Sequence, residues 1–390
     1  MRIALCALLS VAACGGQAAK PDAAPTDSFD RSMLLDHLAT QVLLPLQTRL
    51  ATVAASLPPA IAAYCDALDS GQPGASLAAA RAAWGDTVDA WEAVDALLVG
   101  PAAMDNRAFR DRIYGWPLLS SCGLDRDTAS SFADPASYDA STKLVNVRSL
   151  AAIEYLLYST QIAHTCVTPP TGWDALGANL PRARCRLAHA IAADVVTNAA
   201  ALATAWRADG GNYVAQLALA GHAGSAIATA QDGVNRVSDA MFYVDRMVKD
   251  MKLAEAAGIA VNACGTVDAP CEREVELRYA DRATLAIRIN LGALREAFTG
   301  MTPAANGPGF DDFLTALGHP EVAERMLGKL DDAIAAANAL PDSFLTALTT
   351  DYSKVVATHR AVDLFTDDLK SQFLTLLALE IPDDVATDND

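Results

Sequence analysis

A single carboxylate lies in an otherwise apolar segment, and its position makes it the first candidate for chemistry. The segment Val147 to Ser159 reads VRSLAAIEYLLYS. At helical spacing, Glu154 falls on one stripe with the apolar side chains of Val147, Leu150, Ala151, Leu157 and Tyr158. Burying an unpaired carboxylate is costly, so Glu154 requires an arginine, hydrogen-bond donors, a proton or a metal ion. The pattern therefore indicates either a buried structural ion pair or a functional site.

The rest of the sequence offers no local catalytic motif. It contains no HExxH, GxSxG, P-loop or GxGxxG pattern. The net charge of −18 excludes nucleic acid as a partner, because phosphates require a basic surface. The same charge disfavours direct binding to an anionic membrane. We therefore expect the protein to bind small ligands or other proteins.

The N-terminus predicts the compartment. One arginine and a short apolar run fill residues 1–13, which is typical of a signal peptide and too short for a membrane span. The tetrapeptide VAAC ending at Cys14 resembles a bacterial lipobox, so Cys14 is expected to carry a lipid, with a flexible tether over 14–28. The alternative is an ordinary cleaved signal with an incidental cysteine. No later segment is expected to be long and apolar enough to cross a membrane, so the lipid anchor is the only predicted membrane contact.

The cysteines agree with an oxidising compartment. Removing Cys6 with the signal and assigning Cys14 to the lipid leaves an even number, namely Cys65, Cys122, Cys166, Cys185, Cys264 and Cys271. Two local disulfides are predicted across loops, Cys264–Cys271 and Cys166–Cys185, which leaves Cys65–Cys122 as the third pair. Zinc binding is the alternative, but the sequence has no CxxC motif.

Composition and periodicity predict an all-α fold. Hydrophobic residues make up 52% of the chain but aromatic residues only 6%, so the core must consist largely of alanine, leucine and valine, which favours helices. We predict two packed helical bundles, over 29–205 and 206–380, followed by an acidic tail over 381–390; a duplicated four-helix bundle would fit. Helices are predicted at 29–57 with a kink at Pro45, from Pro58, from Ser76 to Gly100, around Glu154, twice within 181–256, and at 279–298, 310–317, 320–339 and 341–379, with irregular chain at 102–141.

Several successive segments resemble the imelysin family. The Glu154 segment is similar to the helix that carries the GxHxxE signature, with Glu154 at the Glu position, Ala151 at the His position and Ser149 at the Gly position. Further resemblances are QVLLPLQ at 41–47, RAAWGDTVDAWEAVDALLVGP at 81–101, RDRIYGWP at 110–117, DMKLAEAAGI at 250–259 and ELRYADRATLAIRINLGALREAFTG at 276–300.

The resemblance implies an all-α protein of two bundles at the bacterial cell envelope, often linked to iron acquisition. With the lipobox, it predicts a lipoprotein at the periplasmic face of the outer membrane. A His and a Glu three residues apart can supply two metal ligands, whereas Ala151 cannot coordinate. We therefore expect a binding protein for iron or another divalent cation, with no cofactor assigned. The alternatives are an imelysin-type metallopeptidase, and a scaffold for an envelope partner protein with no small ligand.

Three residues are the candidate ligand or metal site: Glu154, Arg112 and Glu276. Arg112 lies in the element that resembles R-I-x-x-W-P and is the expected counter-ion of Glu154. The resemblance carries over Glu276 as a second carboxylate. A cleft between the bundles is the expected location. The alternative for Glu276 is a solvated residue at a helix N-terminus.

Overall fold

The computed structural model describes residues 27–265 and 267–380. The predicted signal peptide, Cys14, nearly all of the tether and the acidic tail lie outside the described residues. In the described part, regular structure is helical, and the only β pairing is an isolated bridge between Met301 and Asn306. The predicted all-α fold is confirmed.

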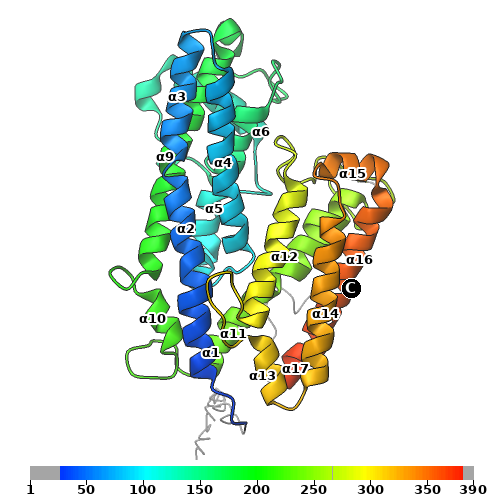
Figure 1. Cartoon of the computed structure of the whole chain (residues 1–390). Coiled ribbons are helices and arrows are strands. Elements are labelled where there is room, and N and C mark those ends of the chain that lie inside the picture. The colour runs from blue at the N-terminus through cyan, green and yellow to red at the C-terminus, as the bar shows by residue number, and fades with distance from the viewer. Residues whose placement is uncertain (1–26, 266, 381–390) are drawn as a thin grey trace, which may run out of the picture.

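The first half of the chain forms an elongated bundle (Figure 1). Its long helices are α1 (Arg31–His37) continuing through the π-helical segment η1 (Leu38–Leu43) into α2 (Leu44–Ala54), then α3 (Leu57–Asp69), α4 (Gly74–Asp95) and α9 (Leu180–Trp206). The predicted kink at Pro45 is replaced by the π-helical segment just before it. Pro45 follows this segment inside the continuous helix, where it has no N–H to donate to the preceding turn.

The segment predicted to be irregular contains two helices, α5 (Met104–Ile113) and α6 (Ser121–Ala133). That prediction was wrong because the polar residues that suggested loops serve as caps and exposed faces. Ser120, for example, accepts a hydrogen bond from the backbone N of Gly123 at 3.1 Å and so caps α6. The Glu154 helix is α7 (Leu150–Tyr158), and the short α8 (Trp173–Leu176) precedes α9.

The second half forms a smaller bundle in which α12 and α16 both lie against α14 (Figure 1). In order, the elements of this half of the chain are α10 (Tyr213–Ala218), α11 (Ala230–Met241), the π-helical η7 (Val244–Glu255), α12 (Ala283–Thr299), α13 (Phe310–Ala316), α14 (Pro320–Asn338), α15 (Phe344–Thr350), α16 (Tyr352–Asp368), the π-helical η8 (Leu369–Phe373) and α17 (Leu374–Leu376). The long helix predicted from 341 is therefore divided, as are the helices predicted within 181–256.

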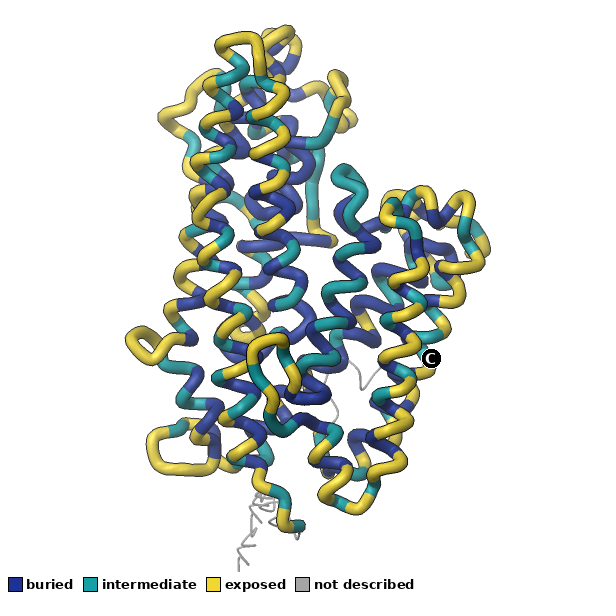
Figure 2. The backbone as a smooth tube through the Cα atoms, in the orientation of Figure 1, coloured by how far each residue is buried: buried dark blue, intermediate teal, exposed yellow. Residues whose placement is uncertain are grey.

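The two bundles share one apolar core. α10 and α11 contact α1, and α12 contacts α4, so apolar residues from both halves join in a single buried cluster (Figure 2). Buried polar residues lie within this core, and Glu92, Lys252 and Asn290 among them lie at the junction of α4 with η7 and α12. The predicted bundle boundary near 205 stays a prediction, because α10 and α11 pack on the first helix of the chain.

Two helical stretches, Arg31–Asp69 and Trp173–Trp206, are long and apolar enough to span a membrane by length and composition. The expectation that no later segment has these properties was wrong. In the fold, α2 and α3 from the first stretch pack on α9 from the second stretch and on α4. This packing favours core helices over membrane spans.

Disulfides link segments that sequence spacing did not pair. Cys264–Cys271 is confirmed. The other two predicted pairs were wrong: Cys65 on α3 bonds Cys185 on α9, and Cys122 on α6 bonds Cys166 in the chain after α7. The reason is that α3 and α9 lie side by side although 120 residues separate the two cysteines, and only the tertiary fold brings their Cα atoms to 5.6 Å.

Candidate functional site

Helix α7, which carries Glu154, is fixed along its length to α4. The Nε1 of Trp84 donates to the carbonyl oxygen of Leu150 at 2.9 Å, and the guanidinium of Arg81 donates to that of Leu157 at 2.8 Å. At its start, Ser149 accepts a hydrogen bond from the N of Ala152 and caps the helix. Hydrogen bonds from α4 therefore fix both ends of α7, which we call the motif helix.

The turn after α5 presses against the start of α7. The backbone N of Ala151 donates to the carbonyl oxygen of Tyr114 at 3.1 Å. Gly115 has φ of +74°, and a Cβ there would lie 2.4 Å from the Oγ of Ser149. Only glycine allows this close approach at a left-handed backbone position. The element that resembles R-I-x-x-W-P therefore positions the motif helix by backbone contact.

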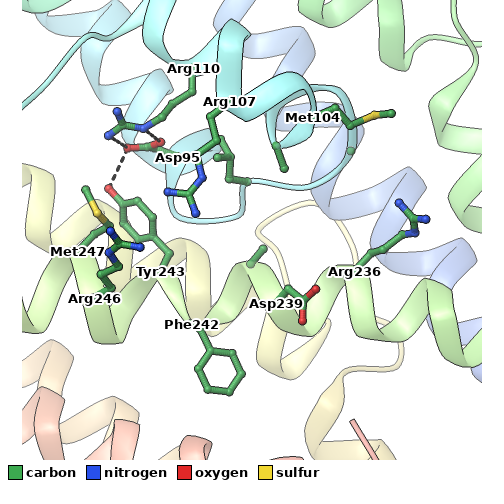
Figure 3. A pocket seen from close by; sticks show the side chains of 14 residues that line it. Asp95, Met104, Arg107, Arg110, Arg236, Asp239, Phe242, Tyr243, Arg246 and Met247 are labelled. Atoms are coloured by element: carbon green, nitrogen blue, oxygen red, sulfur yellow. Dashed lines mark hydrogen bonds and ion pairs between the residues drawn. The ribbon is translucent and has the colours of Figure 1, made fainter. Parts of the chain in front are cut away.

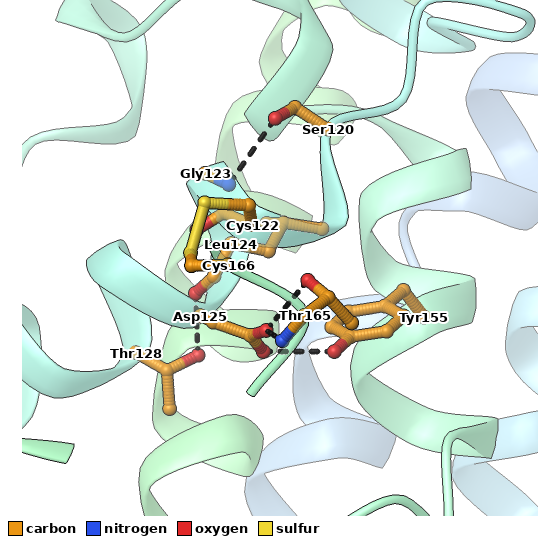
Figure 4. The surroundings of a disulfide bond; sticks show 9 residues. All are labelled: Ser120, Cys122, Gly123, Leu124, Asp125, Thr128, Tyr155, Thr165 and Cys166. Atoms are coloured by element: carbon orange, nitrogen blue, oxygen red, sulfur yellow. Dashed lines mark hydrogen bonds between the residues drawn. A yellow bond between two sulfur atoms is a disulfide. The ribbon is translucent and has the colours of Figure 1, made fainter. Parts of the chain in front are cut away.

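A buried aspartate anchors the chain that follows α7. Asp125 on α6 accepts hydrogen bonds from the OH of Tyr155 at 2.8 Å and from the backbone N and hydroxyl of Thr165 at 2.6 and 2.8 Å (Figure 4). The Cys122–Cys166 disulfide lies beside it. Since Tyr155 directly follows Glu154, this anchor also holds the motif helix in register.

Glu154 is 3% exposed, and its Oε1 accepts two backbone hydrogen bonds, from the N of Tyr279 at 2.9 Å and the N of Ala280 at 3.0 Å. Burial raises the pKa of Glu154 to about 7, against the opposing effect of these two donors and of Arg278. The expected pairing with Arg112 was wrong, because the side chain of Arg112 is exposed and the carboxylate is satisfied by backbone N–H groups.

Ala151 and Glu154 both line a small pocket of about 90 Å³, whose wall also includes Glu274, Arg278 and Tyr279. We call it the motif pocket. The side-chain atoms that could bind a metal ion there do not fit a resident metal. Ala151 has no donor atom, and the Oε1 of Glu154 already accepts two hydrogen bonds. Across 27–265 and 267–380, no cluster of three or more His, Cys, Asp or Glu side chains could hold a metal.

Glu276 belongs to a buried ion cluster rather than to a solvated helix end. Its Oε2 lies 2.8 Å from the Nζ of Lys252, and its Oε1 accepts a 2.5 Å hydrogen bond from the OH of Tyr114. Lys252 also contacts Glu92 at 2.7 Å and donates to Asn290 at 2.7 Å. Burial and the neighbouring Glu92 raise the pKa of Glu276, whereas Lys252 lowers it. The solvated alternative was therefore wrong, since Glu276 is fully buried.

Sequence reasoning missed Lys252, the centre of this cluster. Its signal was available, because Lys252 is the lysine of the DMKLAEAAGI segment and lies among apolar residues of η7. A cationic side chain on a buried face requires an anionic partner, as a buried glutamate does. The structure brings Glu154 and Glu276 to the two ends of one segment, 276–280, and leaves Arg112 outside it.

A second cavity, of about 500 Å³, lies between α5 on one side and α11 with η7 on the other (Figure 3). We call it the arginine cavity, after four residues of its wall: Arg107, Arg110, Arg236 and Arg246. At its base, the buried Asp95 accepts hydrogen bonds from Arg110 at 3.1 Å and from the OH of Tyr243 at 2.9 Å. Sequence analysis did not find this site, because Arg107 and Arg110 precede Arg236 and Arg246 by well over a hundred residues of chain.

Comparison with known proteins gives the same fold. The family model described as Imelysin matches residues 44–372. An imelysin-like protein from Psychrobacter arcticum 273-4 has 18% sequence identity and a TM-score of 0.65, over 91% of this chain and 98% of that one. A putative iron-regulated protein A precursor from Parabacteroides distasonis ATCC 8503 has 17% identity and a TM-score of 0.67, over 91% and 97%. No curated protein matches significantly.

The burial of Glu154 predicts a pH-dependent stability. Because the pKa rises from 4.5 to about 7 on folding, the folded state binds more protons between these values, and stability present at low pH is lost as pH rises through about 7. Glu154→Gln keeps the acceptor oxygen and removes the charge. We expect its free energy of unfolding relative to wild type to increase by about 3 kcal/mol from acidic to mildly alkaline pH. Denaturant unfolding across this range measures it.

The matched control is Glu324→Gln on the exposed face of α14, which should show no such trend with pH. A Glu154→Gln variant whose stability follows wild type in parallel at every pH would show that the carboxylate titrates as an ordinary solvated group.

Removal of the buried ammonium should be severely destabilising. Lys252→Met leaves Glu92 and Glu276 facing each other in the core without a cation, so we expect a loss of about 3–5 kcal/mol of unfolding free energy. Urea unfolding measures this loss. The control, Lys354→Met, removes a surface ion pair with Asp351 and should change little. Equal stability of the two variants would disprove the central role of Lys252.

Proposed function

The chain belongs to the imelysin family, and on this basis we propose that it is a lipid-anchored binding protein of the bacterial cell envelope that serves the acquisition of iron or another cation. The lipobox-like sequence before Cys14 supports the anchor. The cysteines that form three disulfides suit an oxidising compartment such as the periplasm. The likeness to a structural relative described as an iron-regulated protein A precursor supports the link to iron.

One observation favours binding over hydrolysis. The motif helix places Glu154 in the motif pocket, but the position of the motif His is Ala151 and the nearest polar atoms to Glu154 are backbone N–H groups. A metallopeptidase needs a metal held by about three protein ligands and an open coordination position. The motif pocket supplies two carboxylates, Glu154 and Glu274, and no histidine or cysteine, so the residues present support a non-hydrolytic role.

The same donor set limits the form of the cargo. A bare Fe²⁺, Zn²⁺ or Cu²⁺ ion prefers several nitrogen, sulfur or carboxylate ligands, and the motif pocket offers too few of these. A cation that arrives already chelated needs no such ligands from the protein. We therefore take the cargo to be a cation complex rather than a free ion.

A ligand that binds only the folded state raises its thermal stability. We expect Fe(III)-citrate to raise the midpoint of thermal unfolding of the full chain in detergent by a few degrees, and FeSO₄, ZnCl₂ and CuCl₂ to leave it unchanged. Glu154→Gln should keep the shift if the motif pocket is not the binding site. Zinc-dependent cleavage of a peptide substrate that is lost in Glu154→Gln would contradict the proposal in favour of a metallopeptidase.

The lipid anchor has its own test. Because a diacylated cysteine holds a protein at a membrane through its acyl chains, Cys14→Ser should move the protein from the membrane to the soluble fraction of the envelope. Fractionation followed by immunoblotting measures the distribution. Cys6→Ser, in the apolar run before the lipobox, is the control and should stay with the membrane. Equal membrane association of both variants would remove Cys14 as the lipidation site.

A further inference from the structure

The charge of the arginine cavity is opposite in sign to the net charge of the protein. The whole chain carries 47 acidic residues against 29 Lys and Arg. The wall of the cavity has four arginines and two aspartates, Asp95 and Asp239, a formal excess of two positive charges. Since a guanidinium stays protonated at any physiological pH, this excess is permanent. In a strongly acidic protein, such a local reversal points to an anionic ligand.

The negative charge at the base of the cavity is already compensated. Asp95 is fully buried, and its two carboxylate oxygens accept hydrogen bonds from Arg110 at 3.1 and 3.4 Å and from the OH of Tyr243 at 2.9 Å. Arg110 also donates to the carbonyl oxygen of Trp116 at 2.7 Å. The buried base is therefore a rigid, satisfied platform. The remaining charged residues of the wall are Arg107, Arg236, Arg246 and Asp239, and all four are exposed.

The arginines converge from two separate parts of the fold. Arg107 belongs to α5, whereas Arg236 and Arg246 belong to α11 and η7. Figure 3 shows Arg107 and Arg246 extending from facing elements, with Arg236 further along α11. A volume of about 500 Å³ is in the range of small-molecule sites, and Phe242 and Met247 add apolar wall.

The backbone at the cavity supplies an independent observation. Asp105, Asn106 and Arg107 have φ values of 52°, 54° and 62°, three successive left-handed positions without a glycine. Each such position is energetically unfavourable, and runs of them are rare outside functional sites. Here they form the turn that presents Arg107 to the cavity. This strained segment supplies the guanidinium of Arg107 to the wall.

We propose that the arginine cavity binds a small polycarboxylate. Planar guanidinium groups pair with carboxylates through two parallel hydrogen bonds, and several arginines around one cavity match a ligand with several carboxylates. A trivalent cation enters such a cavity as its anionic polycarboxylate complex; this part of the inference rests on the proposed function in cation acquisition. The cavity would then recognise the chelator and not the metal.

Titration calorimetry of the full chain in detergent with sodium citrate, Fe(III)-citrate and inorganic phosphate tests the site. We expect citrate to bind wild type more tightly than phosphate does. Arg107→Gln and Arg246→Gln should each weaken citrate binding about tenfold or more, because each removes a charge-assisted contact. Arg186→Gln, on the exposed face of α9 and absent from the cavity wall, makes the same charge change and should leave affinity unaltered. Added salt should weaken binding.

The outcomes separate the cavity from the proposed function. Absence of citrate binding, tighter binding of phosphate, or equal affinity in wild type and both cavity variants would overturn the polycarboxylate site. Fe(III)-citrate binding that is insensitive to Arg107→Gln and Arg246→Gln would overturn the site while leaving a role in iron acquisition intact. Citrate binding lost in these variants, together with no binding of Fe(III)-citrate, would support the site and count against the role in iron acquisition.

Discussion

The buried ammonium of Lys252 is the contact on which the junction of the two bundles depends. Its Nζ is fully removed from solvent and lies within 2.8 Å of an oxygen of Glu92 on α4, of Glu276 in the turn before α12, and of Asn290 on α12. A buried charge is tolerated only when its partners surround it. One side chain on η7 therefore fixes the relative positions of three other segments, which belong to both halves of the chain.

Both pockets are connected to this cluster by polar contacts. Through Tyr114, which donates to Glu276, the cluster reaches the turn at Gly115 that packs on the start of α7. The few residues after Glu276 then present the backbone N–H groups that Glu154 accepts. Arg110 lies on α5, the helix that precedes this turn. It donates to Asp95 at the base of the arginine cavity and to the carbonyl oxygen of Trp116. Neither pocket can change its geometry without disturbing polar contacts in the core.

Periodicity predicted the fold class because it reports which face of a helix is buried. It identified long helices in both bundles, though not α5 and α6, and it identified the burial of Glu154; the order of family-like segments indicated the family. It does not report which other segment covers a buried face. The partner of Lys252 on α4 is 160 residues away, and the partner of Cys65 is 120 residues away. For the same reason, periodicity could not test the pairing of Arg112 with Glu154. It also could not predict two of the disulfides or the arginine cavity.

The presence of the motif Glu without the motif His has a physical explanation in this fold. The carboxylate of Glu154 satisfies two backbone N–H groups of the turn that begins at Glu276, and buried N–H groups without an acceptor are costly. A glutamate at position 154 therefore stabilises the fold without a metal ion beside it. A histidine at position 151 would take no part in these two hydrogen bonds. Glu154 thus holds the segment that carries Glu276, and through Glu276 and Lys252 it supports the junction that also forms the wall of the arginine cavity. Under the proposed function, Glu154 contributes to ligand binding by positioning the fold, and the arginines of the cavity supply the charge that contacts the ligand.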